Sequence, residues 1–353
     1  MQITRAEVTP VELGLHQPVR MAGYSEINQV TAIFVRLETR EGRDAWGCTV
    51  IPPDPPRQNI EKVLQACQKG ADLAPDLNPI DIEYSLAYLT QATNNVPEAL
   101  CAFDLAFHDL LGLAAGMPLH RILGGYRNKI MTSATVYLGS VQESVELAQM
   151  RAKQGFRMLK IKGGEDPEED VHRIQAIRRA LPDLILRLDA DGGYTVEQAL
   201  DVSRVLGNHL EMIEQPTPAE DMNGLRQVTR HSPVPVLADQ SVRGPASALE
   251  IANHRYADGL SVKVATCGGL RCARQMDAIA RVSHLTMMVS CLVEPALMIA
   301  AGLSFALSSP GIKYADLDGY LDISNDPTVQ SFQMEDGWIV ASDVPGLGCT
   351  VEL

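Results

Sequence analysis

The most restrictive feature of this sequence is a regular alternation of short apolar strands and helical segments from about residue 128 onward. The strand ends recur about every 25 residues, the length of one strand-helix unit. Eight such units predict a closed parallel (β/α) barrel, a TIM-like α/β fold. An open doubly wound sheet is the alternative, but the sequence lacks its glycine-rich turn after the first strand. The predicted strands are 132–138, 158–162, 185–189, 212–214, 236–239, 259–264, 286–289 and 312–315, with helices including 141–154, 166–180, 195–206 and 268–282.

The chain before this alternation has strands first and helices afterwards, which is typical of a separate α+β unit. At 353 residues the chain also exceeds the size at which a single core usually stops growing. The tail from about residue 331 again contains short strands, which we expect to pack back on the N-terminal unit. The predicted N-terminal elements are strands at 3–13, 31–38 and 45–51 and helices at 59–70 and 96–115. The predicted domains are an α+β cap over 1–124, a catalytic barrel over 125–320 and a C-terminal segment over 321–353.

Charge and composition exclude several classes of partner. The formal net charge of −14 argues against nucleic acid and anionic membranes, and no apolar run is long enough to span a bilayer. A small anionic substrate remains possible, because a divalent metal reverses the local charge. The N-terminus alternates apolar and polar residues and has no signal-peptide pattern, and the seven cysteines are an odd number without tight metal-type spacing. We therefore expect free thiols and a cytoplasmic location.

Three acidic residues end three successive predicted strands of the barrel. Asp189, Glu214 and Asp239 follow Lys162 at steps of 27, 25 and 25 residues, and Lys263 follows after 24 more. Since the carboxyl ends of barrel strands form one shared mouth, these side chains are expected to converge. Converging carboxylates repel one another unless a hard cation with a preference for oxygen, such as Mg²⁺, lies between them. The alternative is that each acid is an ordinary strand-end or helix-capping residue.

Lysines flank these acids on both sides. Lys160 and Lys162 lie two apart on one strand, so their side chains share a face, and Lys263 comes from the opposite side of the mouth. Neighbouring ammonium groups and a nearby metal lower the pKa of a lysine, which makes it a usable base near neutral pH. A base on each face of one carbon is what a 1,1-proton transfer requires. The alternative is an anion-binding patch.

The ordered set of motifs resembles the enolase superfamily in its muconate-lactonising branch, over nearly the whole chain. The motifs are residues 99–125, LKIKGG at 159–164, LRLDAD at 186–191, MIEQP at 212–216, PVLADQS at 235–241 and VKVATCGGL at 262–270.

The resemblance implies one Mg²⁺ per subunit, held by Asp189, Glu214 and Asp239. It makes Lys162 and Lys263 the acid/base catalysts, while Lys160 supports the negatively charged oxygen and tunes Lys162. Lysine bases that act with Mg²⁺ are a general feature of this superfamily. A homo-oligomer is expected on the same ground.

An Asp-x-Asp sequence after the eighth strand looks like the dipeptide-epimerase subgroup. By this resemblance Asp316 and Asp318 hold the α-ammonium of a dipeptide, and two carboxylates two residues apart are able to converge on one cation. The alternative is a solvated acidic loop. The chain departs from the family pattern at Asp191, where the family often has Asn, and at Gln240, where an acid usually follows the third metal ligand.

Three further residues bear on the substrate. Tyr24 stands where Ala-Glu epimerases of this subgroup place an arginine, which favours hydrophobic or aromatic side chains, although the nearby Arg20 leaves an acidic side chain open. Glu294, after the seventh strand, either contacts substrate or caps a helix. The favoured function is Mg²⁺-assisted epimerisation at the α-carbon of the C-terminal residue of a dipeptide. The alternatives are Ala-Glu epimerase, o-succinylbenzoate synthase, a cycloisomerase and a non-catalytic metal-binding barrel.

Overall fold

The computed structural model describes residues 1–51 and 60–353, and within them eight parallel strands form the central sheet. Each strand pairs with the next one along the chain. A parallel bridge between Ala315 of the last strand and Thr132, two residues before the first strand, closes the sheet. The barrel prediction is confirmed and the open sheet is wrong. The strands are β5 (Ala134–Val136), β6 (Met158–Lys162), β7 (Ile185–Asp189), β8 (Ile213–Glu214), β9 (Val236–Ala238), β10 (Gly259–Lys263), β11 (Thr286–Ser290) and β12 (Ile312–Asp316).

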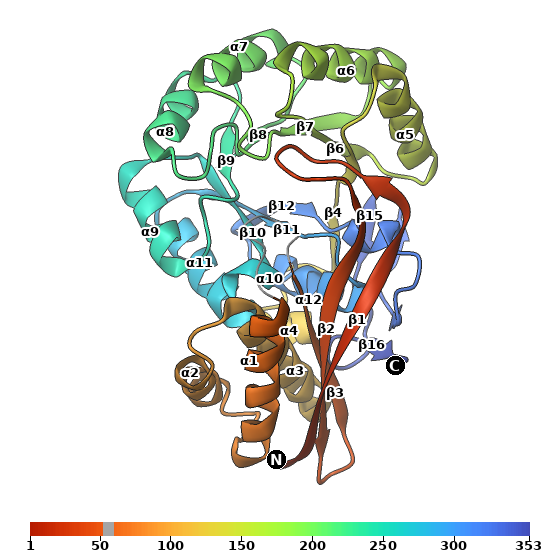
Figure 1. Ribbon diagram of the computed structural model, residues 1–353, viewed down its shortest axis with the longest axis vertical. Coiled ribbons are helices and arrows are strands. Elements are labelled where there is room, and N and C mark those ends of the chain that lie inside the picture. Colours follow the sequence, from red (N-terminus) through yellow and green to blue (C-terminus); the bar gives the residue numbers. More distant parts are fainter. Residues whose placement is uncertain (52–59) are drawn as a thin grey trace.

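Helices connect the strands and surround the barrel (Figure 1). The helices that follow Ser140 and Thr195 begin with a capping box. The hydroxyl of each residue accepts the backbone N–H three positions later, and the side chain at that later position accepts the backbone N–H of Ser140 or Thr195. The predicted helix over 268–282 is wrong at its start, because Gly268 and Gly269 both have positive φ and separate two helices. The helices are α5 (Val141–Lys153), α6 (Pro167–Ala180), α7 (Val196–Leu206), α8 (Met222–His231), α9 (Pro245–His254), α10 (Val264–Cys267), α11 (Leu270–Val282) and α12 (Ala296–Ala306).

The N-terminal residues form an antiparallel three-stranded sheet packed against helices. Helix α3 lies directly on β3, where a Cβ at Gly47 would overlap the Ala102 carbonyl, so only glycine permits this approach. The first strand is longer than the predicted 3–13, and the predicted helix start at residue 59 lies outside the described residues. The elements are β1 (Ile3–Val19), β2 (Ile27–Thr39), β3 (Asp44–Val50), α1 (Ile60–Leu73), the 3-10 helix η1 (Ala74–Asp76), α2 (Ile82–Ala92), α3 (Pro97–Ala115) and α4 (Leu119–Leu123).

Helix α12 connects all parts of the molecule. Its sequence, ALMIAAGLSFA, is apolar on every face, and all of its residues are buried. It contacts β3 and α4 of the N-terminal unit, β11 and β12 of the barrel, and strands of the C-terminal tail. A helix that is hydrophobic all round requires such enclosure. In the described part of the chain, no helix is long and apolar enough to cross a membrane.

The C-terminal tail forms short strands and contacts the N-terminal unit. The Leu119 N–H donates to the Gly346 carbonyl, and the Ser324 N–H donates to the Gly14 carbonyl. The domain boundaries at residues 124 and 320 stay a prediction. The remaining elements are β4 (Lys129–Met131), the 3-10 helix η2 (Gly319–Asp322), β13 (Thr328–Gln330), β14 (Gln333–Glu335), β15 (Trp338–Val340) and β16 (Cys349–Val351). In them β14, β15 and β4 form one sheet, and β13 pairs with β16.

Asp109 on α3 joins three segments of the chain. Its carboxylate accepts the Trp46 N–H of β3 at 3.1 Å and the Leu347 N–H of the tail at 2.7 Å. Burial raises the pKa of Asp109 to about 6, and these two hydrogen bonds only partly oppose the effect. The protonated form is therefore favoured more in the folded chain than in the unfolded chain.

We expect the free energy of unfolding of the wild type, measured relative to Asp109→Asn, to fall as the pH rises from about 4 to about 6. The fall is about 3 kcal/mol at most, since one pKa unit corresponds to about 1.4 kcal/mol. Above this window the difference should be constant. Urea denaturation at a series of pH values measures it, with Asp201→Asn at an exposed position of α7 as the control. A difference that does not change with pH would contradict the prediction.

Candidate active site

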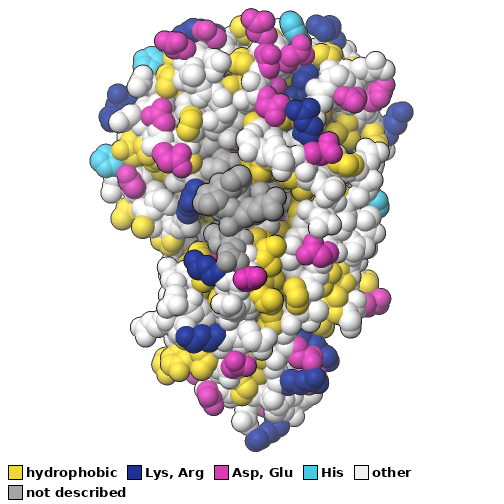
Figure 2. All heavy atoms as spheres, in the orientation of Figure 1, with side chains coloured by type: hydrophobic (Ala, Val, Ile, Leu, Met, Phe, Trp, Pro, Cys, Tyr) yellow, Lys and Arg dark blue, Asp and Glu magenta, His cyan; other side chains and the backbone are white. Residues whose placement is uncertain are grey.

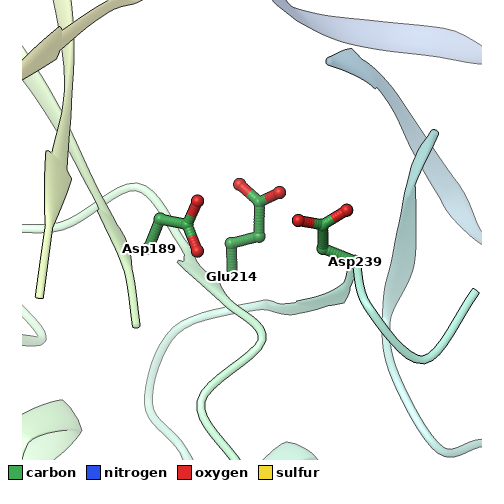
Figure 3. A group of neighbouring side chains, drawn as sticks. All are labelled: Asp189, Glu214 and Asp239. Atoms are coloured by element: carbon green, nitrogen blue, oxygen red, sulfur yellow. The ribbon is translucent and has the colours of Figure 1, made fainter. Parts of the chain in front are cut away.

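Three carboxylates meet at the carboxyl ends of adjacent barrel strands. Asp189 ends β7 and Glu214 ends β8, and the two residues are partners in the strand register. Asp239 directly follows β9. One oxygen of each side chain lies within 4.8 Å of the others, all three side chains are buried, and the carboxyl groups point toward one common region (Figure 3). The convergence expected from the strand spacing is thus present.

The three lysines fill the space around these carboxylates. Lys160 Nζ lies 2.9 Å from Asp189, 2.9 Å from Glu214 and 2.8 Å from Asp316. Lys162 Nζ contacts Asp189 at 2.9 Å and Asp191 at 2.8 Å. All of these side chains are buried, and desolvation of isolated charges at this depth would be costly without such pairing.

Lys263 pairs with both carboxylate oxygens of Asp239 and stands across the barrel from Lys162. Lys162 lies on β6 and Lys263 on β10, and three strands separate them in the sheet order on one side. Because the sheet closes with eight strands, these positions are diametrically opposed. A molecule bound between them would present a different face to each ammonium group.

Burial and neighbouring charge act in opposite directions on the lysines. Burial lowers the pKa of Lys162, and Lys160 lowers it further, as predicted, but Asp189 and Asp191 outweigh both and the pKa lies above its usual value. The pKa of Lys263 is likewise raised, because Asp239 and Glu214 outweigh burial. The expected net lowering is therefore wrong for the chain by itself. A divalent cation held by Asp189, Glu214 and Asp239 would offset part of this negative charge and so act to lower the pKa of both lysines.

The acidic groups also differ in pKa. Burial and the nearby Asp189 raise the pKa of Glu214 to about 7. The pKa of Asp189 lies well below its usual range, because Lys160 and Lys162 overcome the effect of burial. Burial and a neighbouring like charge thus raise the pKa of one acid, while neighbouring opposite charges lower the pKa of the other.

The cluster fits a hard divalent cation. The lysines pair with five carboxylates, which leaves a formal charge of −2 on this group. The Glu214 Oε1 atom is buried without a hydrogen-bond partner, and such an orphaned acceptor is costly unless a ligand occupies it. Three carboxylate donors at one point suit Mg²⁺ in particular, since it prefers oxygen ligands. Asp189, Glu214 and Asp239 would hold it.

Asp316 and Asp318 lie beside this cluster, at the end of β12. Asp316 accepts hydrogen bonds from Ser133 at 2.7 Å and from Ser290 at 3.2 Å in addition to Lys160. Asp318 accepts the Thr135 N–H at 2.6 Å. Burial and the proximity of Asp316 raise the pKa of Asp318 to about 7. Both carboxylates are buried, so the alternative of a solvated acidic loop is wrong.

The other predicted substrate residues lie outside the cluster of lysines and carboxylates. Tyr24 is half-buried in the turn between β1 and β2 and packs against the main core. Arg20 in the same segment pairs with the exposed Glu165 at 3.0 Å, and the Leu138 N–H donates to the Arg20 carbonyl, so the segment is tied to the barrel rim (Figure 1). Glu294 is buried, and burial raises its pKa to about 8.

Sequence reasoning missed a positioning residue, Gln215. Its side-chain oxygen accepts the backbone N–H groups of Asp239 at 2.9 Å and Ser241 at 3.2 Å, and its amide nitrogen donates to the Thr217 carbonyl at 2.9 Å. It thereby fixes the end of β9 relative to β8. Its position immediately after Glu214, inside MIEQP, was the available signal.

Comparison with known protein families agrees with this geometry. The mandelate racemase / muconate lactonizing enzyme N-terminal domain matches residues 3–124, and the enolase C-terminal domain-like family matches residues 143–352. The chain belongs to the enolase superfamily, in its mandelate racemase / muconate lactonizing enzyme family. The predicted family membership is confirmed, and with it an enzyme fold made of a capping domain and a barrel.

Similar members of this family are epimerases. The L-Ala-D/L-Glu epimerase of Clostridium acetobutylicum is 31% identical over 95% of this chain and 94% of its own length. The L-Lys-D/L-Arg epimerase of Desulforapulum autotrophicum is 32% identical over 99% of both. The crystal structure of the dipeptide epimerase from Enterococcus faecalis, complexed with Mg and L-Leu-L-Tyr, has a TM-score of 0.95 and 28% identity, and covers 99% of this chain and 100% of that one.

We expect Glu214→Gln to abolish most of the rise in melting temperature that Mg²⁺ gives the wild type. A bound ligand stabilises the fold according to its concentration relative to Kd, and a lost metal ligand should weaken binding by more than the roughly 10–100-fold that an outer-shell partner contributes. Thermal unfolding over a Mg²⁺ titration measures this. Glu294→Gln, a buried acid outside the cluster, is the control and should keep the shift. A full Mg²⁺ response in Glu214→Gln would contradict the assignment.

Proposed function

We propose that this protein is a Mg²⁺-dependent dipeptide epimerase that inverts the α-carbon of the C-terminal residue. The observation that carries the proposal is the placement of Lys162 and Lys263 on opposite sides of a buried three-carboxylate cluster. The 31–32% identity to curated dipeptide epimerases over nearly the full chain supports it. As an isomerase it needs no second substrate and no redox cofactor.

The two lysines divide the proton transfer between them. One removes the α-proton on its face of the carbon, and the other returns a proton to the opposite face. Magnesium bound by Asp189, Glu214 and Asp239 would supply electrostatic stabilisation of the negative charge that develops next to the substrate carboxylate. Lys160, held by Asp316 and the carboxylate cluster, adds a fixed positive charge to the same region.

The Asp-x-Asp pair gives the site its preference for a free amine. Asp316 and Asp318 lie together at the end of β12, where a substrate ammonium group would form charge-assisted hydrogen bonds with both. The substrates of a muconate cycloisomerase or an o-succinylbenzoate synthase carry no ammonium group for this pair to bind. The pair therefore favours a dipeptide over those substrates.

For the side chains of the dipeptide, we infer a preference for apolar groups. Arg20 is already paired with Glu165, which weakens the case for a glutamate side chain at this position. The residues that follow β11 are Cys291, Leu292 and Val293, which are half-exposed and apolar. The relatives are named for acidic, cationic and hydrophobic dipeptides, so identity alone does not decide the class. Homo-oligomeric assembly and a cytoplasmic location stay predictions.

The deciding experiment incubates the protein and Mg²⁺ in deuterium oxide with a library of L,L-dipeptides. We expect deuterium at the α-carbon of the C-terminal residue together with the L,D product, most rapidly for apolar pairs such as L-Ala-L-Leu. Mass spectrometry and chiral chromatography detect both. Incorporation only into carboxylates that lack an amine would contradict the proposal.

The same assay separates the roles of the lysines. Lys162→Ala should slow exchange from one epimer and Lys263→Ala from the other, each by the roughly 10²–10⁴-fold that general acid/base catalysis contributes. Equal losses from both epimers in each variant would argue against two bases on opposite faces.

Asp318→Asn should raise KM for a free dipeptide by about 10–100-fold, because a charged hydrogen bond to the ammonium group is lost. Its effect on kcat should be smaller. Asp316→Asn should lower kcat as well, since Asp316 also holds Lys160. Steady-state kinetics measures both, with an N-acetylated dipeptide as the control substrate, whose KM should not respond to Asp318→Asn. An unchanged KM for the free dipeptide would contradict the assignment.

A further inference from the structure

The two departures from the family pattern are in direct contact with each other. Asp191 follows β7 and Gln240 follows β9, 49 positions later, and the Gln240 Nε2 atom donates to Asp191 Oδ1 at 3.0 Å. The family often has an amide at the first position and an acid at the second. This chain has the acid first and the amide second. The pair therefore keeps one hydrogen-bond donor and one acceptor. The carboxylate, however, follows β7 in this chain instead of β9.

The chemistry of the two side chains explains why the acid and the amide have changed places together. An ionised carboxylate only accepts hydrogen bonds, so a residue that contacts Asp191 at this distance must present a donor. The glutamine amide does so, whereas a glutamate at position 240 would bring two carboxylates into contact. The amide orientation also leaves Gln240 Oε1 buried without a partner. Gln240 therefore satisfies Asp191 with its amide nitrogen, while its amide oxygen has no hydrogen-bond partner.

The location of the carboxylate matters because it decides which lysine has a partner outside the metal ligands. Asp191 accepts hydrogen bonds from Lys162 Nζ with both oxygens, at 2.9 and 2.8 Å. Asp191 is not among the three clustered carboxylates. Lys263, in contrast, forms its ion pair only with Asp239, itself one of those three, among the described residues. A metal bound by the three carboxylates would compete with Lys263 for Asp239 and with Lys162 for Asp189, but it would not compete for Asp191.

The backbone around Lys162 is also held by groups outside the three-carboxylate cluster. The Lys162 carbonyl accepts from Arg173 at 2.7 Å, and Arg173 is itself paired with Asp170 at 3.0 Å. Asp191 has a positive φ of 46°, and its N–H donates to Asp189. The Lys162 carbonyl and one of the two ion-pair partners of its side chain, Asp191, therefore lie outside the predicted metal ligands, while the other partner, Asp189, is one of them.

We propose that Asp191 and Gln240 form a positioning pair that orients the Lys162 ammonium group toward its face of the substrate carbon, and that this pair makes the two acid/base lysines unequal. Asp191 acts through Lys162 and Gln240 acts through Asp191. The unequal roles of the two lysines in proton transfer rest on the proposed epimerase function. The contact between Asp191 and Gln240 does not depend on activity.

The first test is a double-mutant cycle in thermal stability, in the presence of Mg²⁺, with Asp191→Asn, Gln240→Glu and the double variant. Gln240→Glu should lower the melting temperature when residue 191 is Asp, because two carboxylates then meet. It should have little effect when residue 191 is Asn, because donor and acceptor are again matched. The same fall in both backgrounds would overturn the pair. This readout needs no turnover.

The second test measures α-proton exchange from each epimer separately. Asp191→Asn should slow exchange from the epimer that depends on Lys162, as identified with Lys162→Ala, by about tenfold or more, with little change for the other epimer or for the Mg²⁺ titration. The double variant, Asp191→Asn with Gln240→Glu, should not restore that rate, because its carboxylate no longer contacts Lys162. Equal slowing of both epimers, or of neither, would overturn the positioning role. If the wild type exchanges no dipeptide, the proposed function fails while the stability cycle still decides the pairing.

Discussion

The structure depends on the mutual neutralisation of buried charges at the mouth of the barrel. Lys160, Lys162 and Lys263 are surrounded by carboxylates at ion-pair distance. None of these groups would be tolerated alone at this depth, because desolvation of a single charge exceeds what most folds are able to compensate. The acids exceed the lysines in number, so the cluster retains negative charge. This excess is what suits the site to a divalent cation.

The barrel supplies the precision that such a cluster requires. Neighbouring strands in register bring Lys162, Asp189 and Glu214 side by side, although they lie far apart in the chain. Strands are among the most rigid elements available, and positions on them are held more accurately than positions on loops. Gln215 and Arg173 add hydrogen bonds behind the charged groups, one fixing the Asp239 backbone and the other the Lys162 carbonyl. Chemistry on one carbon atom requires this accuracy.

The cap and the tail both pack against the barrel. The turn between β1 and β2 reaches the barrel rim at Leu138 and Glu165, and the tail strands pack on α12. On the surface, acidic and basic side chains are scattered over both parts of the described chain on the face that Figure 2 shows. At the barrel mouth, in contrast, three lysines and five carboxylates are paired within one cluster. An interior site of this kind is typical of a small-molecule enzyme.

The sequence by itself determined the barrel, the order of its strands and the residues that end them. Strand periodicity depends on local patterns of apolar residues, and a constant spacing places each charged residue at the same point of successive units. It could not determine the pairing within the cluster. That Lys160 lies between Asp189, Glu214 and Asp316, or that Asp191 contacts Gln240, depends on side-chain directions of strands far apart in the chain.

Tertiary structure also decided the direction in which the pKa of the site lysines is shifted. From the sequence, adjacent lysines were expected to lower each other's pKa, but in the folded chain Asp189 and Asp191 contribute more than Lys160 does. Likewise, Arg20 was a candidate substrate ligand in the sequence and is a partner of Glu165 in the structure. Periodicity is a local property that can be read along the sequence. The balance of charge at a point depends on distances and burial, which exist only once distant segments have packed together.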